Sequence, residues 1–239
     1  MVRTNDTGYR MKETVKRVGS LVAKNLSDNK RYLLPLLLWL SGLPVHSQNN
    51  NYRVETFGTR NGLLSPKIYS LAQTTDRQLW IGSELGVSVF DGYSFQNYQY
   101  SSGNETIGRI LSITQDSSAG VWIGGDKGLF FFYHDSISRI EIQNKSPLAI
   151  ESLLTDAAGN LWIGELHALY KISREQIEHI KENILLPLSA EPYCGLKERA
   201  YGLAMDRLHN VYMASHGGIY LFPEARNDYR LIWKNPDVN

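Results

Sequence analysis

The sequence has little of several things that mark whole classes of protein. Its single cysteine, Cys194, excludes an internal disulfide and a cysteine-based metal cluster, and we expect it to be a small buried side chain. It contains no Gly-x-Ser-x-Gly elbow and no phosphate-binding glycine loop, and its six histidines show no zinc-like spacing. After residue 47 the Lys and Arg residues form no cluster of the kind that binds nucleic acid. We therefore expect no catalytic residues, cofactor, metal or nucleic-acid partner, and not an enzyme.

Charge is divided unevenly along the chain. Residues 1–47 hold eight Lys/Arg against three Asp/Glu, a net charge of +5, whereas residues 48–239 hold seventeen against twenty-one, a net charge of −4. The basic leader contains the apolar segment 32–45 and ends in the compact residues Val45, His46 and Ser47. This order predicts a secretory signal peptide, cleavage before Gln48 and export to the periplasm. An uncleaved inner-membrane anchor at 32–45 is the alternative, although about 14 helical residues span only roughly 21 Å.

What the sequence does contain is a repeat. The motif Leu79-Trp80-Ile81-Gly82 returns as Val121-Trp122-Ile123-Gly124, as Leu161-Trp162-Ile163-Gly164 and, in degraded form, as Val211-Tyr212-Met213-Ala214. The aromatic residues are 42, 40 and 50 residues apart. An apolar alternation precedes every copy, and a Gly-apolar step follows all but the third. A unit of this size is the signature of a repeat architecture.

Each repeat divides into short strands, as the second copy shows most clearly. Its expected strands are Arg109 to Thr114, Val121 to Gly124, Leu129 to Tyr133 and Ser138 to Ile142, with turn-prone residues between them. Four strands in about 40 residues, repeated, form the blades of a β-propeller. We therefore predict an all-β fold in which residues 66–222 form about four antiparallel, four-stranded blades. These blades would belong to a seven-bladed ring or, alternatively, to a closed four-bladed one.

The domain organisation follows from these patterns. A leader with its signal peptide (1–47) and a tether with a first strand (48–65) precede blades at about 66–107, 108–148, 149–199 and 200–239. The third repeat carries an insertion at 173–199. Within it, Arg174 to Glu182 predicts one or two helical turns, and Ile184 to Leu188 predicts a short strand. Insertions in repeats usually lie on one face, often the binding face.

Most residues at repeating positions are expected to be structural. Wide aromatics fill the space between blades, and glycines let neighbouring strands approach. The positions assigned to this packing are Trp80, Gly82, Trp122, Gly124, Trp162, Gly164 and Tyr212. The aspartates expected to cap turns are Asp116, Asp156 and Asp206. The first strands offer the channel mainly Ser70, Ser112, Ser152 and Gly202, which are poor material for acid–base catalysis. His209 and His216 lack a third metal ligand, and the ligand-binding residues stay unassigned.

These residues resemble the two-component regulator propeller repeat over about 52–222. Phe90 to Tyr98 matches the closing segment of that repeat, and Phe57 to Ser65 matches the entry to a first blade. The resemblance implies the periplasmic sensor of a hybrid histidine kinase, common in gut Bacteroidetes and often tuned to oligosaccharides. In that family two seven-bladed propellers precede a β-sandwich, a membrane helix, the kinase and a response regulator. This sequence carries about four blades, so we expect a truncated amino-terminal part that lacks the kinase and receiver domains.

Three functions are compatible with these features. The first is a sensor module that binds an oligosaccharide or another small ligand in the propeller mouth. The second is a stand-alone exported propeller that acts as a binding or scaffold protein. The third is a propeller lyase or hydrolase, which would need His, Asp or Arg residues that converge on the channel.

The ends of the repeat array are expected to be uncovered. Tyr52 to Phe57 reads as a closing strand whose partner blade is missing. Exposed sheet edges and apolar faces promote association. The remaining propeller blades or another copy of the chain are therefore the expected protein partners, and the isolated 48–239 product should be oligomeric or poorly soluble.

Overall fold

The computed structural model describes residues 54–142, 149–182, 188, 190, 192–193, 196, 198–224 and 228–237. The predicted signal peptide, its cleavage site and the anchor segment 32–45 lie outside these residues. The chain divides into Met1–Val54 and Glu55–Asn239, and every element described below belongs to the second unit. Within the described ranges, no helix has both the length and the apolar character that a bilayer crossing needs.

Four antiparallel sheets follow one another, each with its strands in sequence order. The first blade contains β1 (Ile68–Gln73), β2 (Leu79–Ser83), β3 (Gly86–Phe90) and β4 (Phe95–Tyr98). The second contains β5 (Ile110–Gln115), β6 (Val121–Gly125), β7 (Gly128–Tyr133) and β8 (Ser136–Ile140). The third contains β9 (Ile150–Thr155), β10 (Leu161–Glu165) and β11 (Leu169–Ile172). The fourth contains β12 (Gly202–Met205), β13 (Val211–Ala214), β14 (Gly218–Phe222) and β15 (Arg230–Lys234). A 3-10 turn, η1 (Thr59–Asn61), precedes the first blade, and helix α3 (Arg174–Glu182) follows β11.

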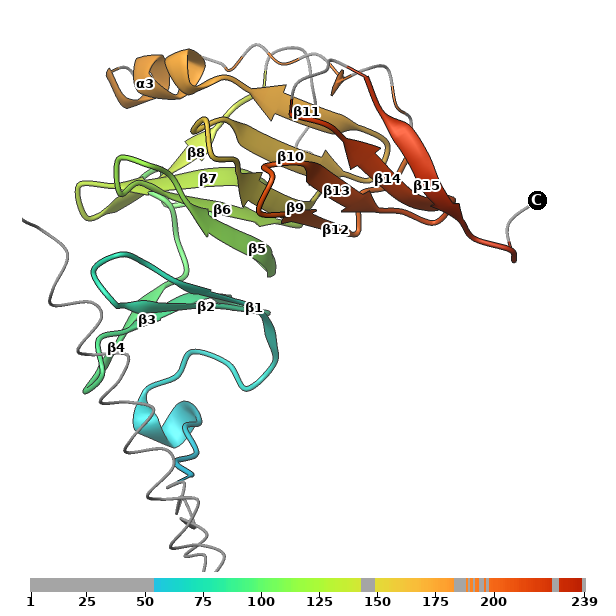
Figure 1. The fold of residues 1–239 in the computed structure, drawn as a ribbon. Helices are drawn as coiled ribbons and strands as arrows, with labels where there is room; N and C mark the ends of the chain where they lie inside the picture. Colours follow the sequence, from blue (N-terminus) through green and yellow to red (C-terminus); the bar gives the residue numbers. More distant parts are fainter. Residues whose placement is uncertain are drawn as a thin grey trace, which may run out of the picture. The chain divides into compact units, whose positions relative to one another are not determined.

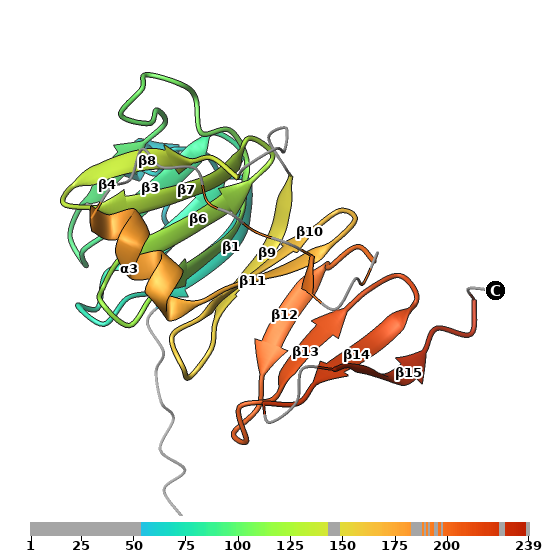
Figure 2. The ribbon, with the colours of Figure 1, turned by 90° about the horizontal axis from the view of Figure 1, so that it is seen from above.

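The first strands of successive blades adjoin one another. β1 contacts β5, β5 contacts β9, and β9 contacts β12. Figures 1 and 2 show the sheets in sequence order, with the first blade (teal) and the fourth (red) at the two ends of the series. Leu71 on β1 is 63% exposed, so among the described residues no blade covers this face. The closed four-bladed alternative is therefore not formed.

The repeat aromatics lie in the core between blades. Trp80, Trp122 and Trp162 are only 2%, 0% and 3% exposed. Each belongs to an apolar cluster that includes first-strand residues of the following blade, such as Ile110 beside Trp80 and Ile150 beside Trp122. This burial agrees with the packing role inferred from the repeat, because an aromatic at a fixed position in every blade can fill the same space each time.

The repeat glycines make room for the following blade. A Cβ on Gly124 would lie 2.5 Å from Ile150 Cγ2, whereas one on Gly82 would overlap Ser70 Oγ of its own blade and lie 2.8 Å from Ile110 Cγ2 of the next. Because carbon atoms do not approach so closely without a shift, the next first strand can reach its position only where no side chain is present. The glycine therefore forms a socket for the apolar side chain of the neighbouring blade.

The predicted fold class is confirmed, but four details differ. The last strand of the second blade is β8 (Ser136–Ile140) and not Ser138 to Ile142. His134 and Asp135 both have positive φ, and they form a two-residue hairpin turn without glycine that brings the strand forward. The four blades extend beyond residue 222, because β15 completes the fourth blade at Arg230–Lys234, inside the range 200–239 expected for that blade. The exposed sequence of this strand gives little alternation from which it could be predicted.

The other two corrections concern the third blade and the first strand. In the described residues the third sheet has three strands, because the chain enters α3 directly after β11; a single bridge joins Tyr170 to Pro192 at that edge. The predicted strand Tyr52 to Phe57 is wrong over residues 54–57, which form no strand. Phe57 instead packs on Phe90 and Phe95 of the first blade. The predicted strand from Ile184 lies outside the described residues except for Leu188.

Candidate functional site

An aspartate turn joins the first two strands of three blades. In the second blade, Asp116 Oδ1 accepts hydrogen bonds of 2.9 Å from the backbone N–H groups of Ser118 and Gly120. Asp116 Oδ2 accepts a third bond, of 3.3 Å, from Trp122 Nε1. One carboxylate therefore caps the turn and also satisfies the polar atom of a buried ring. Turn capping by these aspartates is confirmed, and the bond to the aromatic six residues later is an additional role.

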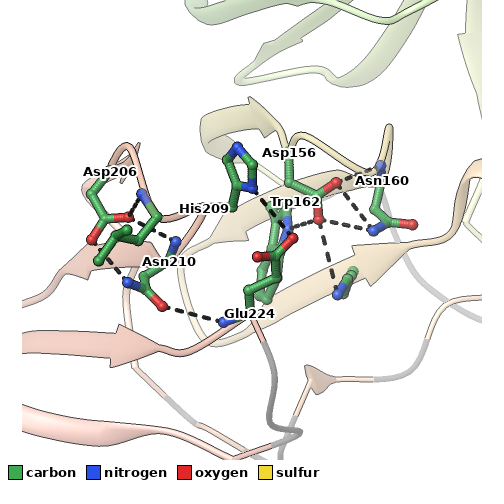
Figure 3. A network of polar contacts seen from close by, with 9 residues as sticks. Asp156, Asn160, Trp162, Asp206, His209, Asn210 and Glu224 are labelled. Atoms are coloured by element: carbon green, nitrogen blue, oxygen red, sulfur yellow. Dashed lines mark hydrogen bonds and ion pairs between the residues drawn. The ribbon is translucent and has the colours of Figure 1, made fainter. Parts of the chain in front are cut away.

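The third and fourth blades repeat this arrangement (Figure 3). Asp156 Oδ2 accepts a bond of 2.9 Å from Trp162 Nε1, and Asp206 Oδ2 accepts one of 3.0 Å from the hydroxyl of Tyr212. Hydrogen bonds from the side chain and the backbone N–H of Asn210, and then from Tyr212, hold the pKa of Asp206 below its ordinary value. The bond to Asp206 raises the pKa of Tyr212. Both shifts favour an ionised aspartate that accepts from a neutral phenol.

The first blade lacks this carboxylate. Thr74 occupies the position six residues before Trp80, and its hydroxyl donates to Asp76 Oδ1 at 2.5 Å and lies 3.1 Å from the Gln78 carbonyl oxygen. Trp80 Nε1 is buried without a hydrogen-bond partner among the described residues. Because a buried unpaired N–H is costly, the sequence difference between Thr74 and Asp116 has a direct physical consequence.

A pocket of about 100 Å³ lies between the third and fourth blades. The aspartate turn of the third blade forms one wall, and the β12–β13 turn and the end of β14 form the other (Figure 3). Its main lining residues are Asp156, Asn160, Trp162, Lys171, Tyr193, His209, Phe222 and Glu224. The pocket therefore combines aromatic surface with groups of both charges, and it depends on the spacing between two blades.

Charged groups are arranged around the aromatic floor of this pocket. Lys171 Nζ lies 4.8 Å from the ring centroid of Trp162 and 5.7 Å from that of Tyr193, which are cation–π distances. The same ammonium lies 3.9 Å from Asp156 Oδ2. At the rim, His209 Nδ1 lies 3.4 Å from Glu224 Oε1. The site can thus offer a donor, an acceptor and a ring face to a small polar molecule.

The corresponding place beside the second blade is filled by α3. Lys181 Nζ lies 3.0 Å from Asp116 Oδ2 as a buried ion pair, although without the alignment of a hydrogen bond. It also lies 6.0 Å from the ring centroid of Phe131. Ser118 Oγ bonds to Glu178, which lowers the pKa of Glu178. The pocket thus sits at the interface where no helix fills this space.

Helix α3 confirms the helical prediction for Arg174 to Glu182. Ser173 Oγ accepts from the Gln176 backbone N–H, and Gln176 Oε1 accepts from the Ser173 N–H. This reciprocal capping box is readable in the sequence as Ser-x-x-Gln, and it fixes where the helix begins. Ile177 and Ile180, three residues apart, are buried in the core.

Two of the three serines singled out on the first strands bond to the next blade, whereas Ser70 Oγ is buried without a hydrogen-bond partner among the described residues. Ser112 Oγ accepts from the Leu153 backbone N–H, and Ser152 Oγ donates to the Ala200 carbonyl, so both serines bond to the next blade. His209 lines the pocket, whereas His216 does not. Within the described ranges, no three His, Cys, Asp or Glu side chains gather as a metal site requires. The pocket residues Lys171 and Glu224 went unnoticed in the sequence, since neither repeats at its position.

Comparison with known proteins gives a fold. No family model matches the chain, and no curated protein matches it. Similar solved structures include an extracellular domain described as that of a hybrid two component system from B. thetaiotaomicron. It matches with a TM-score of 0.58 and 23% identity over 71% of this chain. The chain is built of β-propeller blades. Its blades span only 23% of the length of that similar domain.

A second similar structure is an enzyme. Virginiamycin B lyase from Staphylococcus aureus matches with a TM-score of 0.53 and 12% identity, over 70% of this chain and 56% of the lyase. Propeller blades therefore occur in proteins of different function, and at these identities the likeness shows the blade architecture alone.

Proposed function

We propose that the chain is the ligand-sensing propeller segment of an exported, periplasmic two-component signalling protein. The observation that carries this proposal is the pocket between the third and fourth blades, with its aromatic floor and paired charges. The similar extracellular domain from a hybrid two component system supports the assignment. In this proposal the blades described belong to a larger sensor, and the kinase and receiver activities reside in other domains.

A pocket between blades suits a sensor. Trp162 and Asp156 come from the third blade, whereas Phe222 and Glu224 come from the fourth. A ligand that contacts both walls binds best at one spacing of the blades and stabilises that spacing. The volume of about 100 Å³ admits one small polar group.

Two alternatives follow from the same architecture. A stand-alone exported propeller would use the pocket for binding or scaffolding without a signalling output. A lyase or hydrolase is favoured only by the blade likeness to virginiamycin B lyase, at 12% identity. It would have to turn over its ligand, which a product assay distinguishes from binding.

The test is a ligand screen with matched lysine variants. The purified chain is screened by thermal shift against oligosaccharides and other small polar molecules, and hits are measured by calorimetry. Lys171→Met should weaken binding about tenfold or more, because it removes a charge beside the ring floor. Lys67→Met removes an exposed lysine of the first blade and serves as the control. Equal affinity of the two variants for every hit would contradict the proposed site.

A further inference from the structure

Two polar residues of the pocket between the third and fourth blades are already engaged within the third blade. Asp156 Oδ1 accepts hydrogen bonds of 2.8 and 3.1 Å from the backbone and side-chain nitrogens of Asn160. Asp156 Oδ2 accepts one of 2.8 Å from the same side chain and one of 2.9 Å from Trp162 Nε1. The amide oxygen of Asn160 accepts from the Arg174 backbone N–H at 3.2 Å. Because a carboxylate has about four lone-pair sites, Asp156 and Asn160 have little left to offer a ligand.

Lys171 is a charged group of the pocket that is not engaged in this way. Its ammonium lies 3.9 Å from Asp156 Oδ2, which is beyond hydrogen-bond length, and it lies over the ring faces of Trp162 and Tyr193. The side chain is 32% exposed, and among the described residues no oxygen accepts a hydrogen bond from it. Since an ammonium has three donors, Lys171 can donate to an acceptor that enters the pocket.

The second blade shows the same carboxylate with a lysine held closer. There Lys181 of α3 lies 3.0 Å from Asp116 Oδ2, and its side chain is only 7% exposed. In the third blade the lysine belongs to the sheet itself, because Lys171 and Phe131 each stand nine residues after the aromatic of their repeat. Lys171 therefore supplies the charge that α3 supplies to the second blade, but it stays farther from the carboxylate and open to the pocket.

The fourth blade contributes a negative group to the other wall. The backbone N–H of Glu224 donates to Asn210 Oδ1 at 3.3 Å, which fixes the residue just after β14. Its carboxylate meets His209 Nδ1 through Oε1, at 3.4 Å (Figure 3). The Glu224 side chain is 54% exposed, and Oε2 has no hydrogen-bond or ion-pair partner in the part of the chain that the structure describes. The pocket thus has an available cation on one wall and an available carboxylate oxygen on the other.

We propose that the pocket binds a small zwitterion, an amino acid whose carboxylate pairs with Lys171 and whose ammonium pairs with Glu224. A simple anion would meet the carboxylates of Asp156 and Glu224, and a simple cation would meet Lys171. A zwitterion presents to each wall the opposite charge. Three rings, with centroids 4.8 to 5.9 Å apart, can receive the apolar carbons of such a ligand: Trp162, Tyr193 and Phe222. This assignment names the ligand class of the proposed sensor and rests on that proposed function.

The test is calorimetry with the full 239-residue chain and a panel of free amino acids. The panel varies the separation of the two charges and the size of the apolar part, with glycine, leucine, β-alanine and 4-aminobutyrate as probes. The tightest binder is then compared with its amide, which lacks the carboxylate, and with its N-acetyl derivative, which lacks the ammonium. Each of these losses should weaken binding about threefold to tenfold, because one of the two charge pairs is removed.

Variants assign the two charges of the ligand to the two walls. Lys171→Met should weaken binding of the amino acid about tenfold, and Glu224→Gln, at the more exposed position, about threefold. Lys171→Met should not weaken the amide, and Glu224→Gln should not weaken the N-acetyl derivative, because each compound has already lost the group that pairs there. Lys171→Arg should retain most of the affinity, which separates loss of charge from misfolding. Lys67→Met and Glu84→Gln change an exposed ion pair of the first blade and serve as controls.

The outcomes separate this ligand class from the proposed function. Equal affinity for an amino acid, its amide and its N-acetyl derivative overturns the zwitterion. A neutral sugar that binds through Lys171, when no amino acid does, leaves the sensing pocket standing and shows that the ligand class is wrong. If no compound of either kind depends on Lys171, the ligand class and the proposed function fail together.

Discussion

The second and fourth blades carry the same repeat but expose it differently. Leu129 of the second blade is buried, whereas its counterpart Ile219 in the fourth is accessible to solvent. The glycine of the small pair between the first and second strands also changes strand. In the second blade Gly124 on the second strand faces Ser112, whereas in the fourth blade Gly202 on the first strand faces Ala214. An apolar pattern within one blade therefore predicts a face that can be buried, and the neighbouring blade decides whether it is.

The largest expected difference concerns the repeat aromatic. Trp122→Ala should lower the free energy of unfolding by about 3–5 kcal/mol, because it leaves a cavity between two blades. Tyr212→Ala should cost only about 1 kcal/mol, since one side of that ring has no following blade among the described residues. Urea denaturation of both variants measures the two losses. Equal losses would show that position in the series does not govern the contribution of the ring.

The glycine socket is the next test. Gly124→Ala should lower the free energy of unfolding by about 1–3 kcal/mol, because its Cβ would overlap Ile150. Gly202→Ala is the matched control in the fourth blade, since a Cβ there meets no atom within 4 Å. It should change stability by less than about 0.5 kcal/mol. A neutral Gly124→Ala would mean that the blades can separate without loss.

A smaller effect, of opposite sign, is expected in the first blade. Thr74→Asn should raise the free energy of unfolding by about 1 kcal/mol, because the amide oxygen can accept from Trp80 Nε1. Asparagine is preferred to aspartate here, since Asp76 already contacts the Thr74 hydroxyl. Thr75→Asn, at the exposed neighbouring position, is the control. If the two variants melt at the same temperature, the Trp80 N–H is satisfied in another way.

The smallest expected effect depends on pH. Hydrogen bonds lower the folded-state pKa of Asp206, so its stabilising contribution is present above the unfolded pKa of about 4 and is lost as pH falls through the folded value. Asp206→Asn removes this titration. The variant should therefore be less stable than the wild type at neutral pH, and the two should converge in acid. Denaturation at a series of pH values measures the difference, and parallel curves would contradict it.

The repeat made the fold predictable because the same residue types recur at the same position of successive blades, where their surroundings are alike. Three Trp-Ile-Gly motifs place the second strands, and the glycine in each predicts the close approach of the next blade. The turn at His134 and Asp135 escaped prediction because neither residue is a glycine or asparagine, although both adopt positive φ. β15 was missed since it lies at the end of the series, where no alternation marks a buried side.

The pocket was harder to predict for a different reason. Its walls are distant in sequence, and Lys171 and Glu224 line one pocket only because the third and fourth blades pack side by side. The aspartate six residues before each aromatic was readable as a turn cap, whereas its bond to the ring requires both strands in place. Local turn chemistry is thus visible in one sequence, but contacts between blades are not.

Helix α3 has a mechanical consequence for the series. It leaves the third blade and ends against the turn of the second, where Lys181 meets Asp116 in a buried ion pair. Separating these two blades must break this buried pair as well as expose apolar surface, and it leaves Lys181 only the more exposed Glu178 of its own helix, 3.5 Å away. The joint between the third and fourth blades carries a solvent-accessible pocket at the corresponding place. Separating the second and third blades should therefore cost more than separating the third and fourth, where the ion pair between Arg199 and Glu151 is partly exposed.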